Sequence, residues 1–161
     1  AMQELQDQNL QPDWIVLASS SGGTQAGLLL GAKQISFSGR ILGISVDKPA
    51  DELTQTIMAL ANQTAAWLDI DKKIKSEDVL VNDAYCRAGY GVLQPAETEA
   101  IRLFARTEGI LLDPVYTGRA AAGLIDLIRT GFFRPDETVL FWHTGGIPAL
   151  FAEPYASALL G

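Results

Sequence analysis

Cysteine, histidine and basic residues are scarce in this sequence, and their scarcity excludes several classes of protein. The single cysteine, Cys86, cannot form an internal disulfide. With the single histidine, His143, it is too few for the ligand set of a structural zinc site, so we expect no metal centre. The 12 lysines and arginines are outnumbered by 19 aspartates and glutamates, and the net charge of −7 argues against nucleic-acid binding.

Long apolar runs are also missing. No run reaches the roughly 18 residues of a membrane-spanning helix, so we expect no membrane partner. Residues 1–12 form a polar, glutamine-rich N-terminal segment without the apolar core of a signal peptide. Together with the unpaired cysteine, these features favour the reducing cytoplasm.

The composition that remains is that of one globular unit. The chain has 161 residues, of which 48% are hydrophobic and 19% charged, and this length can bury a core without disulfides. No repeat and no linker-like shift in composition divides it. We therefore expect a single α/β unit over residues 1–161.

Short apolar runs alternate with helical patterns along the chain. The runs predicted as strands are Trp14–Ala18, Arg40–Val46, Gly109–Leu112 and Thr138–Trp142, with a further short strand left open at Val79–Asn82. The predicted helices are Thr24–Phe37, Ala50–Leu68, Pro95–Glu108 and Gly118–Thr130. None of the predicted strands alternates cleanly between apolar and polar residues. We therefore expect both faces of the sheet to be covered. The sequence predicts an open, mainly parallel, twisted sheet of about four strands with helices on both faces.

Three unusual loops each follow a predicted strand and open a helix. They read SSSGGT (Ser19–Thr24), DPVYTG (Asp113–Gly118) and HTGGIP (His143–Pro148). Since the carboxyl ends of parallel strands lie at one edge of the sheet, the three loops should converge on one crevice.

The first loop has the chemistry of an anion site. Gly22 and Gly23 allow close approach of the backbone to a ligand, the serines and Thr24 supply hydroxyls, and the helix that follows offers free N–H groups. The loop lacks the Lys of a P-loop and the spacing of a dinucleotide-binding fingerprint. An ordinary glycine-rich turn before a capped helix remains the alternative.

The other candidates each have a structural alternative. Tyr116 could stack on a planar ring or simply pack over the end of the sheet. His143 could act as a base or be a hydrogen-bonded core residue. Thr144 could bond a ligand heteroatom or cap the next helix, and Tyr90 in the Tyr-Gly turn could bring a phenol to a substrate.

Three long segments in order resemble a known enzyme family. They are SSSGGTQAGLLLGA, EGILLDPVYTGRAAAGLIDLI and VLFWHTGGIPALFA, and together they are similar to the carboxyl-terminal half of the D-cysteine desulfhydrase and 1-aminocyclopropane-1-carboxylate deaminase family. Members of this family are pyridoxal-phosphate (PLP) enzymes of the tryptophan-synthase-β fold, or fold type II. The resemblance runs from about Trp14 to about Leu150 and implies part of the large domain of that fold.

The resemblance assigns roles to residues of the three loops. It implies that the cofactor phosphate is held by Ser20, Ser21, Gly22, Gly23 and Thr24. It also implies that Tyr116 stacks on the pyridine ring, that Tyr90 faces the substrate, and that Thr144 bonds the ring nitrogen with Thr117 nearby. The ring-opening deaminases carry Glu at position 117 and Leu at position 144, so both threonines favour the desulfhydrase-like branch. That branch performs α,β-elimination on a small amino acid and releases pyruvate, ammonia and a thiol or sulfide.

Two departures from the family pattern bear on activity. Ser20 stands where the family usually has Gly, and its Cβ could crowd the phosphate or restrict φ. The family's Schiff-base lysine belongs to the amino-terminal half, and none of the chain's lysines lies in a motif like the family's. PLP chemistry needs that lysine, so the isolated chain is not expected to complete the reaction.

Several interpretations therefore stay open. The chain could be a fragment of a longer enzyme, one chain of a split enzyme completed by a second chain, or a folded remnant that acts through association, for example as a homodimer across an exposed sheet edge. A serine hydrolase using Ser19, Ser20 or Ser21 with His143 is a weaker alternative, because the G-x-S-x-G pattern is absent.

Overall fold

A computed structural model describes residues 1–160, and it confirms the predicted α/β class. The strands are β1 (Trp14–Ser19), β2 (Arg40–Ser45), β3 (Leu80–Asn82) and β4 (Val139–Trp142). The α-helices are α1 (Met2–Asp7), α2 (Gly23–Ile35), α3 (Ala50–Trp67), α4 (Pro95–Thr107), α5 (Thr117–Arg129) and α6 (Tyr155–Leu160). Two 3₁₀-helices, η1 (Ser76–Asp78) and η2 (Ile147–Phe151), complete the elements.

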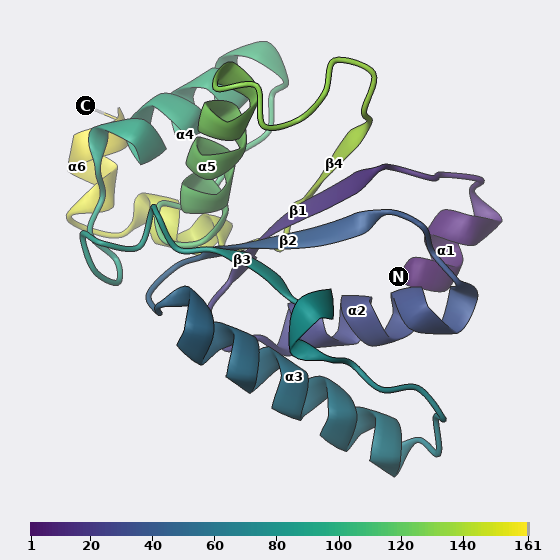
Figure 1. Cartoon of the computed structure of the whole chain (residues 1–161). Coiled ribbons are helices and arrows are strands. Elements are labelled where there is room, and N and C mark those ends of the chain that lie inside the picture. Colours follow the sequence, from purple (N-terminus) through teal and green to yellow (C-terminus); the bar gives the residue numbers. More distant parts are fainter. Residues whose placement is uncertain (161) are drawn as a thin grey trace.

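The four strands form one parallel sheet in the order β3-β2-β1-β4 (Figure 1). Strand β1 lies in the interior, with Leu17 opposite Gly43 of β2 on one side and Trp142 of β4 on the other. The chain leaves β1 toward β2 and β3, whereas β4 joins on the opposite side of β1. The connections therefore change direction between β1 and β4, which is where ligands bind in open α/β sheets.

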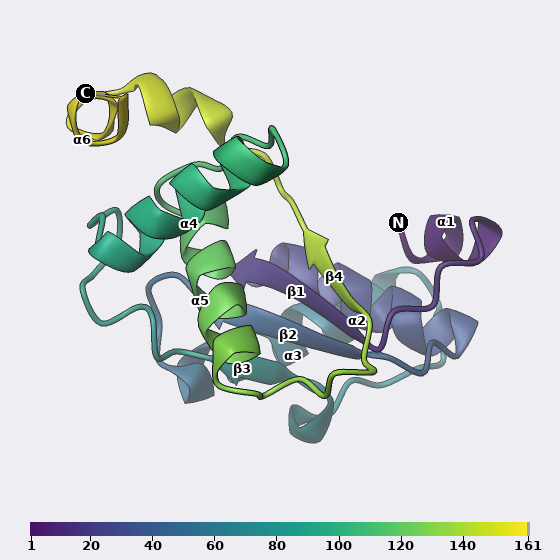
Figure 2. The same ribbon diagram turned by 90° about the horizontal axis from the view of Figure 1, so that it is seen from above.

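Helices cover both faces of the sheet, as the sequence predicts (Figures 1 and 2). On one face, Ile15 and Leu17 of β1 pack with residues of α1, α2 and α3. On the other face, Trp14 and Val16 pack with α5, and α4 lies against α5 farther out. The first four residues of β1 are all buried, which explains why this strand has a continuous apolar run rather than an alternating one.

The predicted strand Gly109–Leu112 is wrong, because this segment is irregular in the structure. Gly109 has a left-handed φ of 67° just after α4, and Ile110 and Leu111 are exposed. The carbonyl of Leu111 contacts the His143 ring at 3.0 Å instead of a neighbouring strand. The fourth strand of the sheet is β3, in the segment that the sequence pattern left open.

The polar N-terminal segment, residues 1–12, contains a short helix that the sequence analysis does not predict. Met2 and Leu5 of α1 are buried against α2. Gly31 of α2 provides the space, since a Cβ there would lie 3.0 Å from Met2 Cγ. Among residues 1–160, no helix is both long enough and apolar enough to pass through a bilayer.

We predict that Gly43→Ala destabilises the chain. A Cβ at Gly43 would lie 2.0 Å from Oε1 of Gln25, whose buried amide donates to the carbonyl of Leu80 on β3 at 2.8 Å. Alanine must displace that amide and leave the carbonyl unpaired, so urea denaturation should show a loss of about 1–3 kcal/mol.

Gly27→Ala on α2 is the matched control. A Cβ at Gly27 meets nothing within 4 Å, so alanine in this helix should gain about 0.5–1 kcal/mol. An equal response of the two variants would show that the Gln25 contact contributes nothing to stability.

Candidate functional site

The structure confirms that the three loops converge. A cavity of about 170 Å³ is lined by Ala18, Ser19, Ser20, Ser21, Gly22, Thr24, Tyr116 and Thr144. These residues come from the end of β1, the start of α2, the residue before α5 and the loop after β4. The cavity thus lies at the carboxyl edge of the sheet, where the connections diverge between β1 and β4.

The serine–glycine loop, residues 19–24, turns directly into α2. Gly22 has a φ of 83°, and a Cβ there would also lie 2.8 Å from Ile57 Cγ1 on α3. Both the backbone conformation and the contact with α3 therefore require glycine. No side chain caps α2, so the amides of its first turn remain available to a ligand.

The lining of the cavity suits an anion. Every lining residue except Ala18 and Gly22 carries a hydroxyl, and none carries a charge. Neutral hydroxyl donors together with free amides at a helix N-terminus are a common phosphate site in proteins. Ser20 is not among the residues with positive φ, so a serine at this position does not strain the backbone.

Two predicted cofactor residues lie outside this lining. A Cβ at Gly23 would meet nothing within 4 Å, and this glycine borders a neighbouring hollow of about 700 Å³ instead. Thr117 is fully buried, and its hydroxyl donates to Asp113 Oδ1 at 2.7 Å while it accepts the Asp113 amide at 2.8 Å. Cofactor contacts of Gly23 and Thr117 therefore stay predictions.

Asp113 organises the turn that presents Tyr116. Its buried carboxylate accepts the amides of Val115, Tyr116 and Thr117 at 2.7–2.8 Å, at the start of α5. The sequence analysis did not single out Asp113. An Asp-Pro pair before a helix is nevertheless a recognisable signal, since aspartate caps helix N-termini.

The loop after β4 packs on the same carboxylate. Gly146 has a φ of 92°, and a Cβ there would lie 2.8 Å from Asp113 Cγ. His143 adds a second link, because its Nδ1 accepts the Gly145 amide at 3.1 Å and its Nε2 donates to the carbonyl of Leu111 at 3.0 Å. With both ring nitrogens bonded to backbone, His143 has none left to activate a serine, which argues against the hydrolase alternative.

Tyr90 and Tyr116 form a pair at the site. Their hydroxyls lie 2.5 Å apart, and their rings meet edge to face with centroids 6.0 Å apart. The hydrogen bond to Tyr90 is the largest cause that raises the pKa of Tyr116 to about 12, and burial and nearby carboxylates add to it. The Tyr116 phenol therefore keeps its proton at neutral pH and shares a hydrogen bond with Tyr90.

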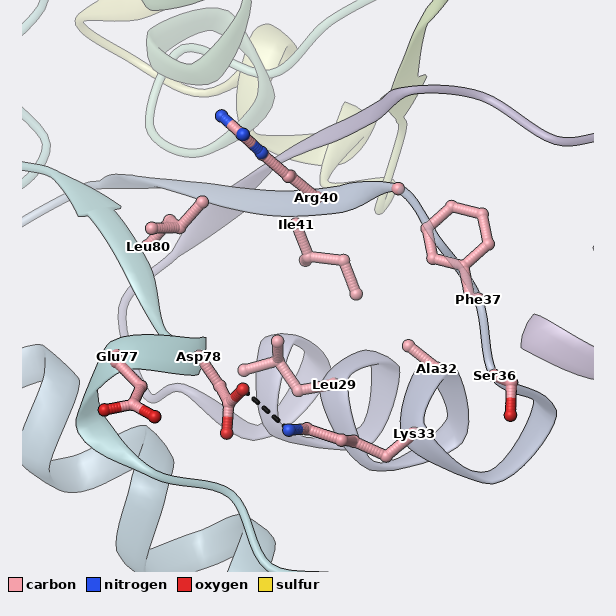
Figure 3. Close-up of a pocket in the computed structure, with 11 residues that line it drawn as sticks. Leu29, Ala32, Lys33, Ser36, Phe37, Arg40, Ile41, Glu77, Asp78 and Leu80 are labelled. Atoms are coloured by element: carbon pink, nitrogen blue, oxygen red, sulfur yellow. Dashed lines mark hydrogen bonds and ion pairs between the residues drawn. The ribbon is translucent and has the colours of Figure 1, made fainter.

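Larger hollows lie elsewhere on the molecule. One of about 620 Å³ lies between α2 and the amino ends of β2 and β3. Figure 3 shows Leu29 and Ile41 facing this hollow, Lys33 paired with Asp78 at 2.7 Å on its border, and Arg40 pointing away from it. None of the five lysines lines the 170 Å³ cavity; they are Lys33, Lys48, Lys72, Lys73 and Lys75.

We predict that Tyr90→Phe lowers the pKa of Tyr116 from about 12 toward the ordinary value of 10.0, because the shared hydrogen bond is lost. A pKa raised by folding contributes stability that is complete below pH 10.0 and disappears as the pH rises through about 12. Ultraviolet absorbance of phenolate against pH measures the midpoint. Denaturation at alkaline pH should show a smaller loss of stability in the variant.

Tyr85→Phe serves as the control for this titration. Tyr85 donates to Asp126 at 2.5 Å and does not line the cavity, so its removal should leave the Tyr116 midpoint in place. A midpoint that is the same in the wild-type and Tyr90→Phe chains contradicts the pairing.

Comparisons with known proteins agree with the resemblance inferred from the sequence. Residues 1–145 match the family described as "Pyridoxal-phosphate dependent enzyme". The chain is 38% identical over 143 residues to the 1-aminocyclopropane-1-carboxylate deaminase of Pseudomonas syringae pv. tomato, a match that covers 89% of this chain and 42% of that protein. The 1-aminocyclopropane-1-carboxylate deaminase of Methylobacterium sp. is 38% identical over 144 residues. This match covers 89% of this chain and 43% of that protein.

A solved structure described as an "ACC deaminase homologue" has the same fold. It superposes with a TM-score of 0.84 at 36% identity and covers 99% of this chain and 47% of its own. The sheet and its helices are thus those of a fold type II domain. The chain spans less than half the length of these curated relatives and of the solved structure.

Proposed function

This chain belongs to the family of pyridoxal-phosphate-dependent enzymes, and we propose that its serine–glycine loop holds the phosphate of that cofactor. The observation that carries the proposal is the cavity that this loop shares with Tyr116 and Thr144. When bound, PLP supplies an electron sink that stabilises negative charge at the α-carbon of an amino acid.

In this proposal, the chain's own residues bind and orient the cofactor. The hydroxyls of Ser20, Ser21 and Thr24 and the first amides of α2 would hold the phosphate, and Gly22 would let it approach the backbone. A contact with Gly23, which lies outside the cavity lining, is also proposed. Tyr116 would lie against the ring, and the Thr144 hydroxyl would bond its nitrogen. A hydroxyl, unlike a carboxylate, leaves that nitrogen largely unprotonated.

We propose α,β-elimination from a small amino acid, giving a 2-oxo acid and ammonia. Thr144 lines the cavity at the position where the ring-opening deaminases carry Leu, which favours the desulfhydrase-like branch. The Tyr90–Tyr116 pair would hold or move a proton at the phenol oxygens on the substrate side. Ring-opening deamination is the second candidate, favoured by the 38% identity to two proteins named as 1-aminocyclopropane-1-carboxylate deaminases.

We further propose that the catalytic lysine comes from residues outside this sequence, on the same polypeptide or on a second chain. The cavity of about 170 Å³ is smaller than the roughly 300–1,000 Å³ of usual ligand sites, and no lysine lines it. A folded, non-catalytic remnant is the alternative. Turnover of D-cysteine or 1-aminocyclopropane-1-carboxylate by residues 1–161 alone would contradict the proposal.

The setting of the protein is also a proposal. The single cysteine supports a reducing, cytoplasmic location. The open edge of β4 supports association with another chain, for example as a homodimer.

We predict that the chain binds PLP and inorganic phosphate and that Ser21→Ala weakens both. Loss of one hydrogen bond to a charged phosphate is worth about 1.5–3 kcal/mol, or roughly 10–100-fold in Kd. Equilibrium dialysis gives Kd directly. With PLP at 100 times its Kd, the wild-type chain should gain about 2.7 kcal/mol of stability, which a thermal-unfolding experiment detects as a higher melting temperature.

Ser38→Ala is the matched control for this binding experiment. Ser38 is an exposed serine between α2 and β2, at the opposite edge of the sheet, and its loss should leave Kd unchanged. Two results would overturn the assignment of the loop: no binding by the wild-type chain, or equal Kd values for the wild-type and Ser21→Ala chains.

A further inference from the structure

A buried ion pair ties α4 to α5. Arg119 is fully buried and Glu97 is 3% exposed, and Nε of Arg119 donates to Oε1 of Glu97 at 2.8 Å. Removing two charges from water is costly, and such a pair is retained only when the remaining donors are also satisfied. The partners of those donors therefore indicate what this pair does.

Both terminal nitrogens of Arg119 donate to backbone carbonyls. Nη1 donates to the carbonyl of Val46, just after β2, at 2.6 Å and to that of Gly89 at 3.0 Å, and Nη2 donates to that of Val92 at 2.8 Å. Gly89 and Val92 are the two ends of the irregular turn that contains Tyr90. One rigid guanidinium thus bonds both ends of the turn and links the turn to the residue that follows β2.

These hydrogen bonds from Arg119 matter because the Tyr90 side chain is largely exposed. Tyr90 is 57% exposed, and its neighbours Gly89 and Gly91 have left-handed φ values of 96° and 72°. Two further hydrogen bonds hold the turn: the Gly89 amide donates to the carbonyl of Cys86 at 3.0 Å, and the Tyr155 hydroxyl donates to the carbonyl of Gly91 at 2.5 Å. The Tyr90 hydroxyl nevertheless lies 2.5 Å from that of Tyr116.

Tyr116 and Arg119 also share one element. Tyr116 immediately precedes α5, and Arg119 lies in its first turn. The start of α5 therefore supplies both the phenol that Tyr90 meets and the guanidinium that holds the Tyr90 backbone. Any displacement of this helix end moves both together, so the pair keeps its geometry.

We infer that Arg119 is a positioning residue, which holds the Gly89–Val92 turn so that the Tyr90 phenol meets Tyr116 at the cavity. The part that these phenols play toward a substrate rests on the proposed function. The contact between the two tyrosines and its dependence on Arg119 do not. Lysine should not replace Arg119, since its three N–H donors radiate from one nitrogen, whereas the guanidinium bonds four acceptors on Glu97, Val46, Gly89 and Val92.

Fluorine NMR of the chain labelled with fluorotyrosine tests this inference. The four tyrosines give separate probes, assigned with single Tyr→Phe variants. In Arg119→Lys, the Tyr116 resonance should move to its position in Tyr90→Phe, and the Tyr90 resonance should move to that of a freely exposed tyrosine. The Tyr85 resonance should stay, since Tyr85 bonds Asp126 on the other side of the turn.

A double variant separates positioning from a general loss of structure. If Arg119 acts on Tyr116 through Tyr90, Arg119→Lys should cause no further shift of Tyr116 in a Tyr90→Phe background. Arg129→Lys is the matched control. It alters the exposed pair between Arg129 and Glu99 at 2.6 Å on the same two helices, and all four resonances should remain.

Glu97→Gln keeps the inference testable if Arg119→Lys fails to fold. This variant removes the charge of the partner but retains the guanidinium and its three carbonyl contacts, so the Tyr90 and Tyr116 resonances should stay at their wild-type positions. Their movement in Glu97→Gln, or their persistence in a folded Arg119→Lys chain, overturns the inference. An equal shift of Tyr85 in Arg119→Lys overturns it as well.

The outcome is distinguishable from failure of the proposed function. A chain that binds no PLP but shows the Tyr90-dependent shift loses the cofactor assignment and keeps the positioning role. A chain that binds PLP but shows no shift keeps the cofactor assignment and loses the positioning role.

Discussion

Burial of β1 on both faces is the constraint on which the rest of the structure depends. Because Ile15 and Leu17 face α2 and α3 while Trp14 and Val16 face α5, helices must lie on each side of the sheet. Helical crossovers then make all strand pairs parallel, and their carboxyl ends meet at one edge. The convergence of the serine–glycine loop, Tyr116 and Thr144 follows from this layering, and the contact of Gly146 with Asp113 adds to it.

The sequence predicts the features that depend on local pattern and topology. Continuous apolar runs identify β1 and β2, and glycine and serine after β1 identify the loop at the cavity. The prediction for segment 109–112 fails because an apolar run after a glycine has the composition of a strand, yet the segment does not belong to the sheet of β3, β2, β1 and β4. The roles of Arg119 and Asp113 depend on carbonyls and amides that come together only in the fold. The spacing of apolar residues along the sequence therefore cannot predict these roles.

The site is built from neutral donors held by buried charges. Hydroxyls and amides face the cavity, while the carboxylate of Asp113 and the guanidinium of Arg119 lie behind it and bond mainly to backbone. This division keeps the lining free of fixed charge and leaves an anion free to enter. It also places the turns at Tyr116 and at Tyr90 next to one helix start, where the side chains of Asp113 and Arg119 hold them through hydrogen bonds to backbone groups.

Gln25 extends the influence of the cavity across the sheet. It follows Thr24 in the first turn of α2, and its amide passes beneath Gly43 to the carbonyl of Leu80 on the outermost strand. The same helix turn that offers its amides to an anion is therefore mechanically joined to β3, a strand of only three residues. A ligand bound at this turn would therefore contact a helix end that a single side chain bonds to the outermost strand on the far side of the sheet.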